Sequence, residues 1–241
     1  MIESLSLLGI HKLSGESFDL LSRKLIKFVD LSPSSMGIDL ATDRLNIKVL
    51  RQVRDYMLSS NVSLNAVQGV FFGIDTHDSQ LLKHAEHRLK SICDAMDTLD
   101  CENIYIGAPS LRASQSWSSL MDMTFTIAES RSKRVIVENI CHIPCSQNLL
   151  SHYAGLNAID LENVCVDISN FAECEKMTEI FKELFLKAKY VHLSGQNHSL
   201  PQRSDLFFTE MQSASRRLNK CITYEFLGYE LDEMAYFFDE T

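Results

Sequence analysis

Four residues of this chain could together bind a metal ion: Glu138, Asp167, His192 and Glu225. Each lies near the end of a short apolar run that is typical of a buried β-strand, and the runs are RVIVENI, NVCVDIS, KYVHLSG and CITYEF. Helical segments separate these runs, as in successive β/α units. Three carboxylates and one imidazole at the same height on neighbouring strands suit a hard divalent cation, so we predict a catalytic metal site.

The alternation of side chains along each strand supports this grouping. In NVCVDIS, Val164, Val166 and Ile168 share one face, whereas Cys165 and Asp167 share the other. Three carboxylates converging at the strand ends would repel one another, and a divalent cation relieves that repulsion. Oxygen-rich ligation with one imidazole favours Mn²⁺, Co²⁺ or Mg²⁺ and also admits Zn²⁺. The alternative is that each residue is an isolated strand-end polar group, which caps a helix or pairs locally.

The rest of the chain alternates predicted strands and helices. The clearest helix buries Leu82, Ala85, Leu89 and Met96 and turns Arg88 mostly toward its wet side. Eight strands alternating with helices predict one domain, 1–241, folded as a single α/β (β/α)8 TIM barrel. An open doubly wound sheet would carry a GxGxxG turn after its first strand, and LLGIHKLSG lacks this motif. The predicted strands are Leu5–Ile10, Met36–Leu40, Ser63–Phe72, Asn103–Ile106, Arg134–Asn139, Asn163–Ile168, Lys189–Leu193 and Cys221–Phe226.

The composition is typical of a soluble globular protein with an acidic surface. The 241 residues include 23 Lys+Arg and 32 Asp+Glu, for a net charge of -9, which disfavours a nucleic-acid partner. Seven scattered cysteines suit a reducing cytoplasm, and Cys141 and Cys145 have no matching second pair for a zinc knuckle. No run approaches the roughly 20 apolar residues that span a bilayer, and MIESLSLLGIHKL does not fit a signal peptide. We therefore predict a cytoplasmic protein without a membrane partner.

Several segments resemble the xylose isomerase-like TIM barrels, a group of sugar phosphate isomerase/epimerase-like proteins. It contains sugar isomerases, ketose 3-epimerases, inosose dehydratases and, more distantly, the endonuclease IV (AP endonuclease family 2) enzymes. The similarity covers essentially the whole chain and is strongest in LNAVQGVFFG, DAMDTLDCENIYIGAPSLR, VIVEN, VCVDISN, YVHLSG and TYEF. In the ketose epimerases a Glu, Asp, His, Glu set holds the metal, and Glu138, Asp167, His192 and Glu225 match it position by position. The resemblance implies that Glu138 and Glu225 also exchange the substrate proton.

The residues around this metal set depart from the epimerase pattern. Epimerases have a His three residues after the metal Asp and an Arg six residues after the metal His, and here these positions hold Asn170 and His198. A second substrate Glu is replaced by Pro144. Gln68 could bind a substrate hydroxyl or equally satisfy barrel backbone groups. The predicted substrate-binding residues are Gln68, Arg112, His142, Asn170 and His198.

The resulting hypothesis is a divalent-metal-dependent isomerase or epimerase that acts on a sugar or a related hydroxy-carbonyl compound. The cation polarises the carbonyl, one of Glu138 and Glu225 removes the neighbouring C–H proton to give an enediolate, and the other returns a proton. Loss of a β-hydroxyl at the same site would instead define a lyase or dehydratase. A degenerate metabolite-binding barrel and a scaffold subunit of a biosynthetic complex are the non-enzyme alternatives. The expected partners are a small-molecule substrate and, by analogy with related barrels, further copies of the chain.

Overall fold

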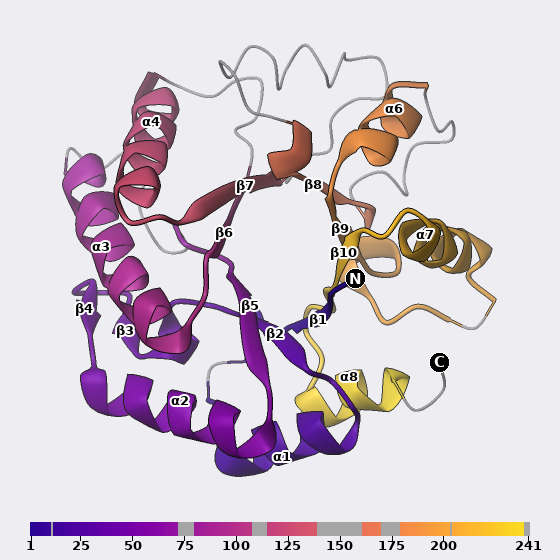
Figure 1. The fold of residues 1–241 in the computed structure, drawn as a ribbon, viewed down its shortest axis with the longest axis horizontal. Helices are drawn as coiled ribbons and strands as arrows, with labels where there is room; N and C mark the ends of the chain where they lie inside the picture. The colour runs from indigo at the N-terminus through magenta and orange to yellow at the C-terminus, as the bar shows by residue number, and fades with distance from the viewer. Residues whose placement is uncertain are drawn as a thin grey trace.

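Eight parallel strands close into a barrel in the computed structural model of this chain (Figure 1). The structure describes residues 1–10, 12–71, 80–107, 115–138, 161–169, 179–202 and 204–238. Around the barrel the strands follow the order β1, β2, β5, β6, β7, β8, β9 and β10, and β10 pairs with β1 to close the ring. The predicted (β/α)8 TIM-barrel fold is therefore confirmed.

The barrel strands are short, and helices surround them (Figure 1). The strands are β1 (Glu3–Ser6), β2 (Phe28–Leu31), β5 (Ser63–Val67), β6 (Asn103–Gly107), β7 (Arg134–Glu138), β8 (Val164–Asp167), β9 (Tyr190–Leu193) and β10 (Cys221–Tyr224). The helices are α1 (Gly15–Arg23), α2 (Ile47–Ser60), α3 (Leu81–Leu99), α4 (Gln115–Ser130), α6 (Glu179–Lys187), α7 (Leu206–Arg217) and α8 (Leu231–Phe237).

Two apolar layers follow from the alternation of side chains along these strands. Residues of the outward faces, such as Val135, Val137, Val164 and Val166, belong to the large core beneath the helices. A smaller buried cluster fills the barrel interior, as in other TIM barrels. Its members are Ala66, Tyr105, Ile136, Cys165 and Tyr190. The strands are thus covered on both faces, which explains their near-continuous apolar runs.

The second barrel strand does not lie where the sequence predicted it. The predicted strand Met36–Leu40 was wrong, because it falls on a 3-10 turn and on β3 (Ile38–Asp39), which pairs antiparallel with β4 (Arg44–Leu45). Gly37, at a φ of 90°, turns the chain there. The true strand, β2, has the sequence FVDL. A buried aspartate, Asp30, interrupts its apolar run, and this concealed the strand from hydropathy.

Helix α3 buries one residue that the sequence assigned to its wet side. Arg88 is only 2% exposed, and its Nε donates to Asp43 Oδ1 at 2.6 Å while Nη2 donates to the Leu40 carbonyl at 2.8 Å. The β3–β4 segment covers the helix here and supplies acceptors in place of water, as a buried guanidinium requires. Leu82, which was predicted to be buried, is 42% exposed.

The described cysteines and helices test two further expectations. Cys93, Cys101, Cys165 and Cys221, the cysteines within the described ranges, are free thiols. Within the described ranges, no helix combines the length and the apolar character needed to cross a membrane.

Candidate functional site

The predicted metal ligands lie at the carboxyl ends of β7, β8 and β9 and directly after β10. His192 on β9 pairs directly with Asp167 on β8 and with Thr223 on β10. Glu138 ends β7 and pairs with Cys165, two residues before Asp167. The four ligands therefore do not share one register level. Because Glu138 has a longer side chain than Asp167, it can still reach the same imidazole.

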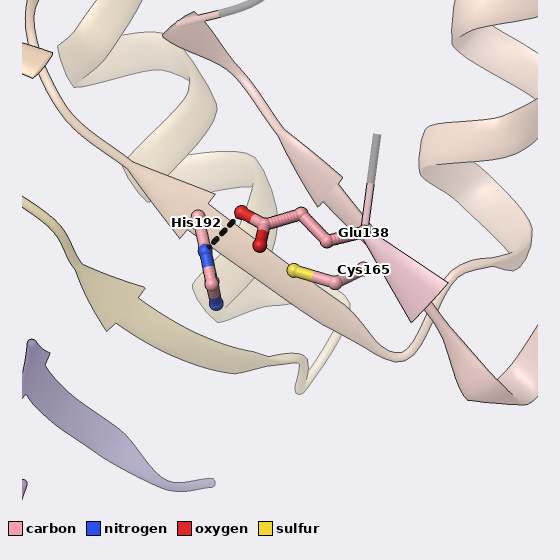
Figure 2. Close-up of side chains that lie close together, drawn as sticks. All are labelled: Glu138, Cys165 and His192. Atoms are coloured by element: carbon pink, nitrogen blue, oxygen red, sulfur yellow. Dashed lines mark ion pairs between the residues drawn. The ribbon is translucent and has the colours of Figure 1, made fainter. Parts of the chain in front are cut away.

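The imidazole of His192 is the centre of the site. The residue is fully buried, and its Nδ1 lies 2.6 Å from Glu138 Oε1 and 2.9 Å from Glu225 Oε2. Figure 2 shows the Glu138 side chain reaching from β7 toward this ring. Neither contact has hydrogen-bond geometry, and within the described part of the chain Nδ1 has no hydrogen-bond partner. Two carboxylate oxygens thus form close ion pairs with one buried ring nitrogen, an arrangement in which a shared cation would take the place of the imidazole proton.

The electrostatics of the site also favour added positive charge. Burial alone would lower the pKa of His192, but the neighbouring Cys165 and Glu138 raise that pKa well above its ordinary value. Burial raises the pKa of Asp167, and the nearby charge of Glu225 raises it further. The His192 shift comes from neighbouring negative groups, and the Asp167 shift comes first from burial and then from the charge of Glu225. A cation held among them would relieve this cost.

A thiol is the site residue that sequence reasoning missed. The ligand atoms of Glu138, Cys165 and His192 all lie within 4.8 Å of one another, and Figure 2 shows the three side chains together. Asp167 and Glu225 are outside this group of mutually close atoms. Burial raises the pKa of Cys165 to about 12. The signal was present in the sequence, because Cys165 precedes Asp167 by two positions and therefore shares its face of β8. Hereafter Glu138, Cys165, Asp167, His192 and Glu225 are the candidate metal centre.

Loops after β8 and β9 hold the Asp167 carboxylate. The backbone N–H of Ser169 donates to Asp167 Oδ1 at 2.9 Å, and its hydroxyl donates to the same oxygen at 2.8 Å. His198 Nε2 lies 3.7 Å from Asp167 Oδ2 and 3.2 Å from Ser169 Oγ. Asn197 and His198 both adopt left-handed φ values, 54° and 56°, and the Leu227 N–H donates to the His198 carbonyl at 2.9 Å. His198, predicted to contact substrate, thus lies against a predicted metal ligand in a strained turn.

Gln68 lies inside the barrel, directly after β5. It is 3% exposed, and its Oε1 accepts from the Ser6 hydroxyl at 2.7 Å. Its Nε2 lies 3.3 Å from Asp30 Oδ2 and 3.4 Å from His192 Nε2. The side-chain amide, predicted to bind substrate, is therefore engaged by protein groups, one of which is the central imidazole.

Beside Gln68 is a second buried polar group, the saturated cluster of Ser4, Asp30, Asn65 and Thr223. Asp30 Oδ1 accepts from Asn65 Nδ2 at 2.8 Å, and Oδ2 accepts from Thr223 Oγ1 at 2.8 Å. The Ser4 hydroxyl lies 3.4 Å from the same Oδ2. Burial raises the pKa of Asp30 to about 6, against the lowering effect of these donors. This cluster was not predicted, because the strand that carries Asp30 was itself not predicted.

Three predicted substrate-binding residues, Arg112, His142 and Asn170, lie outside the described residues, as does Pro144. The structure therefore does not test these predictions.

Solved structures with this fold are similar over nearly the whole chain, although no protein-family model and no curated protein sequence matches it. The apo form of the 3-keto-D-glucoside 4-epimerase YcjR from E. coli has a TM-score of 0.69 at 13% identity and covers 98% of each chain. The IolI protein with a bound zinc atom has a TM-score of 0.69 at 12% identity, over 100% of this chain and 96% of that one. The D-psicose 3-epimerase of Clostridium cellulolyticum H10, solved with D-tagatose, has a TM-score of 0.66 at 11% identity, over 95% of this chain and 86% of that one. The chain therefore shares the (β/α)8 barrel fold of these proteins.

Proposed function

We propose that this protein is a divalent-metal-dependent isomerase or epimerase of a sugar or a related hydroxy-carbonyl compound. The observation that carries the proposal is the contact of Glu138 and Glu225 with one buried imidazole nitrogen, at 2.6 and 2.9 Å. These groups lie at the carboxyl ends of the strands, where TIM-barrel enzymes have their active sites. The sugar epimerases among the similar structures support the same class of substrate.

A divalent cation fits the donor set of this site. Glu138, His192 and Glu225 would hold it, because His192 Nδ1 is buried, faces two carboxylate oxygens and has no hydrogen-bond partner among the described residues. Asp167 would complete the set. Oxygen donors with one imidazole favour Mn²⁺, Co²⁺ or Mg²⁺, while the adjacent Cys165 thiol adds a donor that Zn²⁺ also accepts. The zinc atom of the similar IolI protein supports a divalent ion at a barrel of this fold.

We assign proton transfer to the two glutamates. A bound cation would supply Lewis-acid charge that polarises the substrate carbonyl. Glu138 and Glu225 both contact the same ring nitrogen, which supports placing the two carboxylates at one substrate site. One carboxylate removes that proton to give an enediolate, and the other returns a proton to the opposite face or to the adjacent carbon. The first outcome is epimerisation and the second is isomerisation.

Solvent exchange tests the proton-transfer roles directly. The wild type is incubated in D₂O with a panel of keto-sugars and inososes, and deuterium incorporation at carbon is followed by NMR. We expect incorporation with at least one compound and its loss in both Glu138→Gln and Glu225→Gln, with the circular dichroism spectrum of each variant unchanged. Wild-type exchange in both variants would contradict the proposal. Release of water without exchange would favour the dehydratase alternative.

Cytoplasmic location, assembly into homo-oligomers and the single-domain organisation of 1–241 remain predictions that accompany this proposal. A small-molecule substrate without a nucleic-acid partner is consistent with the net charge of -9.

A further inference from the structure

The amide of Gln68 joins three parts of the barrel interior. Its Oε1 accepts a hydrogen bond from Ser6 on β1 at 2.7 Å, and its Nε2 lies 3.3 Å from Asp30 on β2. The same Nε2 lies 3.4 Å from Nε2 of His192 on β9. With 3% of its surface exposed, Gln68 has little area to offer a ligand. Its contacts therefore point toward a role on the imidazole.

The two nitrogens of an imidazole have linked roles, because the partner of one decides what the other can do. In the observed orientation the Gln68 amide presents its NH₂ to Nε2 of His192, and Nδ1 faces Glu138 and Glu225. When Nδ1 gives its lone pair to a cation, Nε2 must carry the proton and needs an acceptor. A half-turn of the same amide supplies Oε1 as that acceptor.

The surroundings of Gln68 tolerate both amide orientations. The hydroxyl of Ser6 can donate to Oε1 or accept from the NH₂ group. The turned amide would place Oε1 opposite Asp30 Oδ2, and a proton on this carboxyl, whose pKa burial raises to about 6, would donate to it, while Asn65 and Thr223 still donate to Asp30 at 2.8 Å each. One amide can thus hold the ring in the same place whether Nδ1 faces a proton or a metal ion.

We propose that Gln68 is a positioning residue that orients His192 so that Nδ1 is directed at Glu138 and Glu225. The proposal rests on the proposed metal site, and it replaces the predicted substrate contact of Gln68 with a role that acts through the imidazole. Outer partners of a metal-bound imidazole typically contribute 10- to 100-fold to metal affinity.

The test compares two buried amides that both donate to Asp30. Gln68→Met keeps the length of the side chain but removes its hydrogen bonds, and Asn65→Leu does the same at a residue that contacts Asp30 and Ser4. Binding of Co²⁺ to each purified protein is measured by isothermal titration calorimetry. We expect Gln68→Met to weaken Co²⁺ binding by roughly 10- to 100-fold. Asn65→Leu is expected to bind Co²⁺ with an affinity close to that of the wild type.

Two further measurements keep the test decisive. Ser6→Ala removes the hydroxyl that holds the amide but leaves Gln68 itself, so a smaller loss of Co²⁺ affinity is expected even if Gln68→Met does not fold. In the metal-free protein, ¹⁵N NMR should show a shifted Nε2 resonance of His192 in Gln68→Met and an unchanged one in Asn65→Leu.

The outcomes separate this proposal from the proposed function. Co²⁺ binding that is equal in wild type, Gln68→Met and Ser6→Ala would overturn the positioning role and leave the metal site intact. Equal losses in Gln68→Met and Asn65→Leu would assign the effect to packing around Asp30 and would also overturn it. If the wild type binds no Co²⁺, the metal proposal fails, and the ¹⁵N shift of His192 alone decides the role of Gln68.

Discussion

The saturated cluster and the candidate metal centre occupy the same barrel interior but differ in how their buried polar atoms are hydrogen-bonded. In the saturated cluster, Asp30 accepts hydrogen bonds from Asn65 and Thr223 at 2.8 Å each. In the candidate metal centre, His192 Nδ1 lies against two carboxylates without hydrogen-bond geometry. A buried polar group that meets its partners stabilises one structure, whereas one without them costs free energy unless a ligand completes it. From this difference we propose that the first cluster supports the barrel and that the second binds a ligand.

The largest effect is expected when a glutamate of the candidate metal centre is neutralised. This change should weaken metal binding strongly without lowering the stability of the metal-free protein. We expect Glu225→Gln to weaken Co²⁺ binding by more than about 100-fold, since it removes a proposed ligand rather than an outer partner. The free energy of unfolding of the metal-free protein should be unchanged or higher, because one of several crowded negative charges is gone. Calorimetry and urea unfolding measure the two effects. Glu210→Gln, at an exposed glutamate of α7, is the control, and similar Co²⁺ affinities in the two variants would contradict the assignment.

The saturated cluster should instead reveal itself in the pH dependence of stability. The pKa of Asp30 is raised from 3.8 to about 6 by burial, so the folded state holds this proton more tightly than the unfolded state. The resulting stability is present below the unfolded pKa and is lost as the pH rises through the folded pKa. Asp30→Asn lacks this loss, so its stability relative to the wild type should improve by about 2 kcal/mol from pH 4 to pH 7. Parallel urea-unfolding curves at all pH values would show that Asp30 does not titrate in this way.

A smaller effect is expected when the saturated cluster loses a single donor. Thr223→Val is close in shape but cannot donate to Asp30 Oδ2. We expect the free energy of unfolding at pH 7 to fall by about 1–3 kcal/mol. The reason is that the charged, buried carboxylate of Asp30 loses one of its hydrogen-bond donors. Co²⁺ affinity should stay within about twofold of the wild type, although Thr223 pairs with His192 in the sheet. A large loss of Co²⁺ affinity in Thr223→Val would contradict this separation and show that the saturated cluster also contributes to metal binding.

The smallest effect is expected at the thiol of the candidate metal centre. Burial raises the pKa of Cys165 to about 12, so a cation must displace a tightly held proton before sulfur can bind it. Hard ions that prefer oxygen ligands should therefore not be coordinated by the thiol, and Cys165→Ala should change Mn²⁺ affinity by less than about threefold. Titration of both proteins with Mn²⁺ measures this. A near-ultraviolet sulfur-to-metal absorption band in the Co²⁺-loaded wild type, lost in the variant, would instead make Cys165 a ligand.

The contrast between the two clusters also explains what the sequence could predict. Glu138, Asp167 and His192 lie at the ends of apolar runs. The alternation of side chains along a strand and a polar residue at its end can both be read from the sequence without tertiary information. The barrel followed from the same runs and the helices between them. Residue types at strand ends therefore predicted both the fold and the polar groups that meet at its carboxyl end.

The remainder depended on contacts that a single sequence does not encode locally. Asp30 broke the apolar run of β2 and hid that strand, although the residue is buried because Asn65 and Thr223 meet it from other strands. Arg88 was assigned to solvent because its partner, Asp43, lies 45 positions away. The register that pairs Glu138 with Cys165 likewise depends on the stagger of the closed barrel.

Metal content is the most direct test of the account. Protein purified without chelators is analysed by elemental mass spectrometry, with His192→Ala and Thr223→Val prepared in parallel. We expect about one divalent transition metal per chain in the wild type and in Thr223→Val, and none in His192→Ala. Absence of metal from the wild type, together with no thermal shift on adding Mn²⁺, Co²⁺, Zn²⁺ or Mg²⁺, would contradict it. The carboxylates and imidazole would then be a buried ionic network, and a metabolite-binding barrel would become the better description of the protein.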